Sequence, residues 1–202
     1  MPAPDSVDVF WATPRPPATL DTLLVDSDRH HLDWLRSDAA REESATARAL
    51  LRAVLAARFG VSPEAIEISR ACPECTRSHG RPTVANLPVH VSASHSDQRV
   101  VVAVTGIAPV GVDVEWVIPQ RMAGVGLTTA EWTRREAWFK ATGGVGAFDP
   151  QTVLASGGRH VDVGRGYQAA VYLEGDIRPP ITVTAADDLL SAWAASPRTT
   201  TA

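Results

Sequence analysis

Residues 110–115 read Val-Gly-Val-Asp-Val-Glu, and this stretch decides how the second half of the chain folds. Valine at every second position predicts a β-strand. Asp113 and Glu115 stand two residues apart, so both carboxylates leave the same face of that strand. Like charges at neighbouring positions on one face repel each other. A cation between them would explain the pair, and hard oxygen ligands favour Mg²⁺ over zinc.

A second informative stretch, residues 132–140, reads Trp-Thr-Arg-Arg-Glu-Ala-Trp-Phe-Lys. We expect a helix on which Glu136 and Lys140 share one face, beside Arg135. A third carboxylate and two cations then come from one short helix, which predicts a site for a metal-bound pyrophosphate. The alternative is a solvated strand edge and a surface helix whose i,i+4 ion pair contributes only about 0.2–0.5 kcal/mol.

The remaining pattern predicts one long helix and several short strands. Apolar residues recur at helical spacing over residues 38–59, and Gly60 stands where a C-terminal cap belongs. The proline-rich residues 1–20 are expected to form an extended entry with one edge strand over residues 7–11. Alternating or continuous apolar runs predict further strands at residues 66–69, 89–93, 99–105, 160–163, 167–173 and 181–185.

Each half of the chain is therefore expected to hold a long helix followed by strands. The links between the strands are too short for parallel crossovers, so the predicted fold class is α+β with mainly antiparallel pairing. We expect an N-terminal subdomain of residues 1–108 and a C-terminal subdomain of residues 109–202.

Composition excludes several classes of function. The 202 residues are 45% hydrophobic, which is typical of a globular protein, and the formal net charge of −4 argues against general nucleic-acid binding. No apolar run reaches the roughly 18 residues of a membrane span, and the N-terminus lacks the features of a secretory signal. Two cysteines fit a reducing compartment. We expect a cytoplasmic monomer that binds neither nucleic acid nor membrane.

Two upstream segments complete a larger pattern: Gly80-Arg81-Pro82 and Ser92-Ala93-Ser94-His95-Ser96. With residues 111–115 and 132–140 they form four ordered blocks, which resemble the 4′-phosphopantetheinyl transferases of the surfactin-synthetase-activator type. The resemblance runs from about residue 47 to about residue 184. It implies two similar subdomains, each a helix packed on a small sheet, with the active site in the cleft between them.

The resemblance also implies an activity. Such an enzyme transfers the 4′-phosphopantetheine arm of coenzyme A to a serine of an acyl or peptidyl carrier protein. The reaction depends on Mg²⁺ and serves polyketide, nonribosomal peptide or fatty-acid assembly. By resemblance, Asp113, Glu115 and Glu136 would be the metal ligands, and these three with Lys140 the catalytic residues. Glu136 is the candidate acceptor of the serine proton.

Contacts to coenzyme A follow from the same resemblance. The backbone of the turn Gly80-Arg81-Pro82 would lie against the adenine, so Arg81 and Pro82 would contact the cofactor, and Arg81 would reach a phosphate. Ser94 and His95 would contact the nucleotide phosphates, and Arg135 and Lys140 would neutralise phosphate oxygens.

Two departures from the family favour an alternative. Arg135 stands where the family has lysine, and a guanidinium does not replace a compact ammonium. Only sixteen residues separate Glu115 from Trp132, and residues 117–129 are expected to form a loop where relatives carry a longer helical segment. The alternative is a family-like protein that has lost transfer and serves as a binding module or acts on another substrate.

A third hypothesis rests on Cys72, Cys75 and His79. Their spacing is seen in zinc knuckles, which would make the chain a small zinc-bearing interaction domain. The alternative, which we favour, is that the two cysteines are unpaired reduced thiols in a loop.

Overall fold

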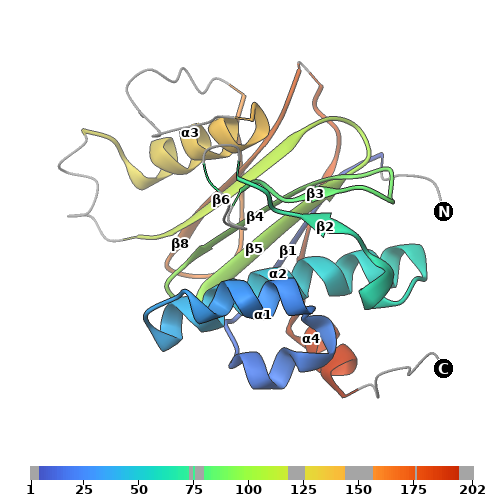
Figure 1. Ribbon diagram of the computed structural model, residues 1–202. Coiled ribbons are helices and arrows are strands. Elements are labelled where there is room, and N and C mark those ends of the chain that lie inside the picture. The colour runs from blue at the N-terminus through green and yellow to red at the C-terminus, as the bar shows by residue number, and fades with distance from the viewer. Residues whose placement is uncertain are drawn as a thin grey trace.

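The computed structural model describes residues 5–72, 75, 80–117, 126–143, 157–175 and 177–195. The first sheet has the strand order β4-β5-β1-β9 (Figure 1). Its neighbouring strands pair antiparallel, except that β1 and β9 run parallel. The strands are β1 (Val7–Ala12), β4 (His90–Ser96), β5 (Arg99–Thr105) and β9 (Ile181–Ala185).

The second sheet has the order β6-β8-β7, with antiparallel pairing throughout. Its strands are β6 (Val110–Trp116), β7 (Arg159–Val161) and β8 (Tyr167–Leu173). β6 is an edge strand, and only one of its edges pairs with β8. A short antiparallel pair, β2 (Ile68–Ser69) with β3 (Thr83–Val84), forms a two-stranded sheet of its own.

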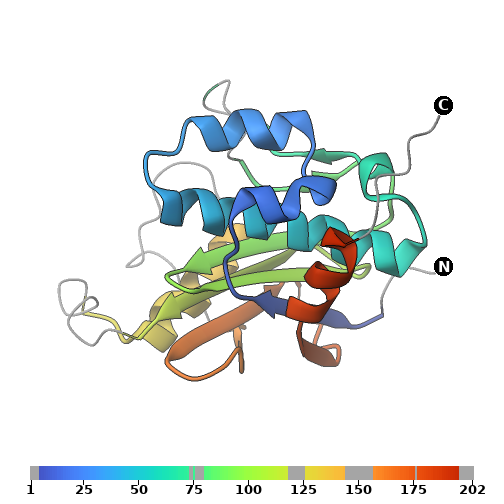
Figure 2. The same ribbon diagram turned by 90° about the horizontal axis from the view of Figure 1, so that it is seen from below.

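The two longest described helices cover opposite sides of the molecule. α2 (Asp38–Phe59) packs on the first sheet, as Figure 2 shows, and α3 (Thr129–Ala141) packs on β6 and β8. As the sequence predicts, Gly60 ends α2 in the left-handed conformation, with φ of 65°. Smaller helical segments pack around α2: η1 (Pro17–Leu23), α1 (Asp26–Asp33), η2 (Pro63–Ala65) and α4 (Asp187–Ala194).

Strand β5 explains how the layers hold together. Val100, Val102 and Val104 belong to the core between the first sheet and α2, while Val101 and Ala103 belong to the core shared with the second sheet. A strand buried on both faces needs apolar side chains at every position, which is why residues 99–105 show no alternation. The layer order is therefore α2, first sheet, second sheet, α3.

The mixed α+β class and the mainly antiparallel pairing are confirmed. The predicted edge position of residues 7–11 is wrong, because β1 lies between β5 and β9. Its second partner comes from residues 181–185, far away in sequence, and a local pattern does not reveal such a pairing.

The division at residues 108 and 109 stays a prediction. That division assigns both β9 and α4 to the C-terminal subdomain. However, β9 pairs with β1, and α4 packs on η1 and α2. Within the described part of the chain, no helix is both long and apolar enough to cross a membrane. The predicted loop at residues 117–129 falls largely on residues 118–125, which lie outside the described residues.

Candidate functional site

Gly111 allows α3 to lie directly on β6. A β-carbon at Gly111 would stand 1.9 Å from the carbonyl oxygen of Ala137 and 2.7 Å from the amide nitrogen of Ala141, so only glycine fits. Ala137 and Ala141 are themselves small and fully buried. Glu136 and Lys140 each precede one of these alanines, so the close packing brings both side chains to the acidic face of the strand.

Three carboxylates converge there. Asp113, Glu115 and Glu136 each offer an oxygen, and these oxygens lie within 4.8 Å of one another. Asp113 is 2% exposed, whereas Glu115 and Glu136 are half-buried. The structure thus brings together the three side chains that the sequence analysis assigned to a metal.

Lys140 completes this acidic cluster. Its Nζ lies 2.7 Å from Asp113 Oδ1 and 3.5 Å from Glu136 Oε1, and it donates to Ser94 Oγ at 3.0 Å. Burial opposes the charge on Lys140, but the two carboxylates outweigh burial and raise its pKa above the usual range. Lys140 is the only lysine in the sequence, in which every other basic side chain except histidine is arginine. A compact ammonium fits among these oxygens where a planar guanidinium would not.

The Asp113 carboxylate, with one buried oxygen that lacks a hydrogen-bond partner among the described residues, is the feature that favours a cation most strongly. Burial raises its pKa to about 7, with Lys140 opposing and Glu136 adding to the shift. Its Oδ2 is buried and has no hydrogen-bond partner among the described residues. An unsatisfied buried carboxylate oxygen is unfavourable, and a bound cation would satisfy it. A donor set of three carboxylates, without thiol or imidazole, fits Mg²⁺ or Mn²⁺.

Serine hydroxyls hold two of these carboxylates. Ser94 Oγ donates to Asp113 Oδ1 at 2.8 Å, and Ser96 Oγ donates to Glu115 Oε2 at 2.9 Å. Ser94, expected to contact phosphates, has its hydroxyl engaged inside the cluster. Ser96 was not predicted as a site residue. The signal that could have found it is spacing, because both serines and both acids are two residues apart on their strands.

His95 points to the other face of β4. Its Nδ1 lies 2.9 Å from Glu43 Oε2 on α2, and the side chain is 41% exposed. Desolvation and the positive charge of Lys140 lower the pKa of His95, and Glu43 opposes them. A neutral His95 that donates from Nδ1 keeps Nε2 as an acceptor. Sequence reasoning gave Glu43 no role, since its contact with His95 joins segments far apart in the chain.

Arg81 lies at the end of α3. Its Nη1 donates to the carbonyl of Ala141 at 2.9 Å, so the guanidinium caps the helix C-terminus. Burial lowers the pKa of Arg81, and Glu174 opposes the shift. Pro82 follows as a buried residue, and Arg135 is half-buried on α3 next to Glu136. The structure therefore places Arg81 against the helix that carries Glu136 and Lys140.

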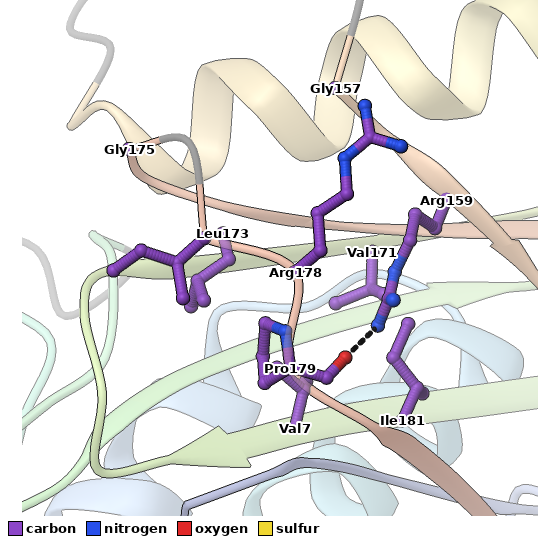
Figure 3. Close-up of a pocket in the computed structure, with 10 residues that line it drawn as sticks. Val7, Gly157, Arg159, Val171, Leu173, Gly175, Arg178, Pro179 and Ile181 are labelled. Atoms are coloured by element: carbon purple, nitrogen blue, oxygen red, sulfur yellow. Dashed lines mark hydrogen bonds between the residues drawn. The ribbon is translucent and has the colours of Figure 1, made fainter.

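A pocket lies elsewhere, between the second sheet and the segment that leads into β9 (Figure 3). It encloses about 410 Å³, its open mouth included. Arg159 donates from Nη2 to the carbonyl of Pro179 at 2.7 Å across it, and Arg178 stands beside them. None of the predicted site residues lines this pocket, so it is separate from the acidic cluster.

The zinc hypothesis rests partly on His79, which lies outside the described residues together with residues 73–74. It stays a prediction.

No protein-family model matches this chain, and no curated protein matches it. The resemblance to phosphopantetheinyl transferases therefore rests on the four sequence blocks.

Proposed function

We propose that this chain is a Mg²⁺-dependent 4′-phosphopantetheinyl transferase. Its substrates would be coenzyme A and a serine of an acyl or peptidyl carrier protein in polyketide, nonribosomal peptide or fatty-acid assembly. One observation carries the proposal: the oxygens of Asp113, Glu115 and Glu136 lie within 4.8 Å of one another, beside the ammonium of Lys140. These four residues come from two of the four sequence blocks, which are separate in the chain.

The layer arrangement supports a site between two units. α2 on the first sheet and α3 on the second are each a helix packed on a small sheet. The acidic cluster lies where edge strand β4 meets edge strand β6. A pyrophosphate bound there would contact residues of both units, in agreement with the cleft that the resemblance implies.

The chemistry requires neutralisation of negative charge and removal of one proton. Bound Mg²⁺ would neutralise pyrophosphate oxygens and make the reacting phosphorus more electrophilic. Asp113, Glu115 and Glu136 would hold the ion, and Lys140 would donate to a phosphate oxygen. The carrier serine oxygen bonds to the phosphorus as the bond to adenosine 3′,5′-bisphosphate breaks.

The serine proton needs an acceptor in this reaction. Glu136, half-buried at the rim of the cluster, is our candidate. A carboxylate that also binds a metal is a weak base, so Glu136 would serve as the acceptor directly or through a water molecule.

Intact-mass measurement tests the proposal. The protein is incubated with coenzyme A, Mg²⁺ and a panel of apo carrier proteins. We expect a carrier to gain one phosphopantetheine group only when Mg²⁺ is present. Asp113→Asn should abolish the gain, whereas Glu64→Gln, a change at an exposed carboxylate remote in sequence, should not.

No mass gain with any carrier would contradict transfer. If such a protein still bound coenzyme A, the result would favour the alternative of a binding module that has lost transfer. The arginine at position 135 and the short segment at residues 117–129 are the sequence features that motivate this alternative.

A further inference from the structure

On the edge of β6 that does not pair with β8, three backbone amides donate hydrogen bonds to side chains of β4. Successive serine hydroxyls of β4 take the place of the carbonyl acceptors of a neighbouring strand. The backbone amide nitrogen of Val112 donates to Ser92 Oγ at 3.0 Å. In the same way, the amide of Val114 donates to Ser94 Oγ at 3.4 Å, and that of Trp116 donates to Ser96 Oγ at 3.1 Å. We call these three serines the serine ladder.

Two rungs of the serine ladder have a second role. Ser94 Oγ accepts a hydrogen bond from a backbone amide of β6 and also donates one to the carboxylate of Asp113. Ser96 does the same toward Glu115. Ser92 accepts an amide in the same way, but Gly111 at the matching position has no side chain to receive a hydrogen bond.

The two carboxylate oxygens of each acid therefore have different roles. Asp113 Oδ1 receives both Ser94 and Lys140, while Oδ2 is buried without a partner among the described residues. For Glu115, Ser96 holds Oε2. One oxygen of each carboxylate is thus held by a serine hydroxyl, and Asp113 Oδ2, which has no hydrogen-bond partner among the described residues, is left for a further ligand.

We propose that Ser94 and Ser96 are positioning residues that orient Asp113 and Glu115 for a divalent cation. This inference rests on the metal site of the proposed function. A side chain that hydrogen-bonds to one oxygen of a metal-binding carboxylate fixes the orientation of that carboxylate before the ion binds. Loss of such a side chain typically weakens metal binding about 10–100-fold.

Ser96 gives the clearest test, since Ser94 also contacts Lys140. The variants are Ser96→Ala and Ser96→Thr, with Ser92→Ala as the matched control. Each alanine leaves one β6 amide without its acceptor, so Ser92→Ala and Ser96→Ala should both lower the melting temperature. Mn²⁺ alone is the probe, and its affinity is measured by electron paramagnetic resonance on the full chain without coenzyme A.

We expect Ser96→Ala to weaken Mn²⁺ binding about 10–100-fold. Ser96→Thr, which keeps the hydroxyl, should restore the affinity, and Ser92→Ala should leave it unchanged. Unchanged affinity in Ser96→Ala, or an equal loss in Ser92→Ala, would overturn the positioning role while leaving the metal site in place. A wild-type protein that does not bind Mn²⁺ would overturn the metal site itself, and the positioning role with it.

Discussion

Lys140 and Asp113 form a charge pair whose acidic partner is almost completely enclosed, with 2.7 Å between Nζ and Oδ1. Removing one partner of such a pair leaves the other charge buried without compensation. Lys140→Met should therefore lower the free energy of unfolding, by up to about 3–5 kcal/mol where Asp113 must stay ionised. This loss of unfolding free energy in Lys140→Met should be smaller at pH 5 than at pH 8, because at pH 5 the buried Asp113 carboxyl takes up a proton. Urea unfolding at both pH values measures this, and equal losses would contradict the pairing.

The raised pKa of Asp113 predicts how stability depends on pH without metal. Burial raises the pKa from 3.8 to about 7 in the folded protein, so the unfolded chain releases this proton first. Between about pH 4 and pH 7 the folded state binds more protons than the unfolded state, and this group's contribution to stability falls as pH rises. Asp113→Asn removes that contribution. Unfolding curves of both proteins in chelator, recorded from pH 4 to pH 8, should therefore diverge over this window, and parallel curves would rule the shift out.

Gly111 is predicted to be irreplaceable for a steric reason. In Gly111→Ala the new β-carbon would meet backbone atoms of Ala137 and Ala141, which cannot rotate away. Overpacking typically lowers stability by about 1–3 kcal/mol, and rigid backbone places this variant at the upper end. We also expect weaker Mn²⁺ binding, because α3 must move away from β6.

Gly60→Ala is the control for that variant. Its β-carbon would meet nothing within 4 Å, and only the left-handed conformation, with φ of 65°, is unfavourable for alanine. It should lose about 1–2 kcal/mol and keep its Mn²⁺ affinity. Equal Mn²⁺ affinity in both variants would show that the close contact of α3 with β6 does not shape the site.

Patterns local in sequence predicted most of the helices and strands. The pairing and packing of these elements depend on contacts between residues far apart in the chain. The continuous valine run of β5 and the alternation of β6 are visible in the chain itself. α1 (Asp26–Asp33) was missed because its sequence, DSDRHHLD, lacks an apolar period. Its buried Asp28 pairs instead with Arg48 and Arg52 of α2.

The candidate site shows the same division. Its three acids and Lys140 could be named from spacing within two short segments. Ser96 and Glu43 could not, since their roles come from contacts with Glu115 and His95 that only the folded chain creates.

Asp28 gives a prediction on stability away from the site. Its carboxylate lies 2.8 Å from Arg48 Nη1 and 3.3 Å from Arg52 Nη2, and all three side chains are buried. Burial alone would raise the pKa of Asp28, but the two arginines outweigh it and lower the pKa. Asp28→Ala leaves both guanidinium groups without this counter-ion and should destabilise the fold by about 3–5 kcal/mol.

The exposed Asp26, which pairs with Arg29 on the surface, supplies the control. Asp26→Ala should change the unfolding free energy by no more than about 1 kcal/mol. Urea unfolding at pH 7 compares the two variants. In wild type, the contribution of Asp28 should be present above pH 3.8 and lost as pH falls through its lowered pKa. Equal effects of the two alanine variants would contradict a structural role for the buried pair.

The most direct test of the central claim, that three carboxylates bind a divalent cation beside Lys140, uses the single lysine of the chain. Protein grown with lysine that carries ¹³C only at Cε gives one Lys140 side-chain carbon signal in the NMR spectrum, with no other lysine to overlap it. We predict that Mg²⁺ shifts this signal saturably and that substoichiometric Mn²⁺ broadens it. Both effects should be absent in Asp113→Asn and retained in Glu64→Gln. A Lys140 signal that neither ion changes in the folded wild-type protein would contradict the account.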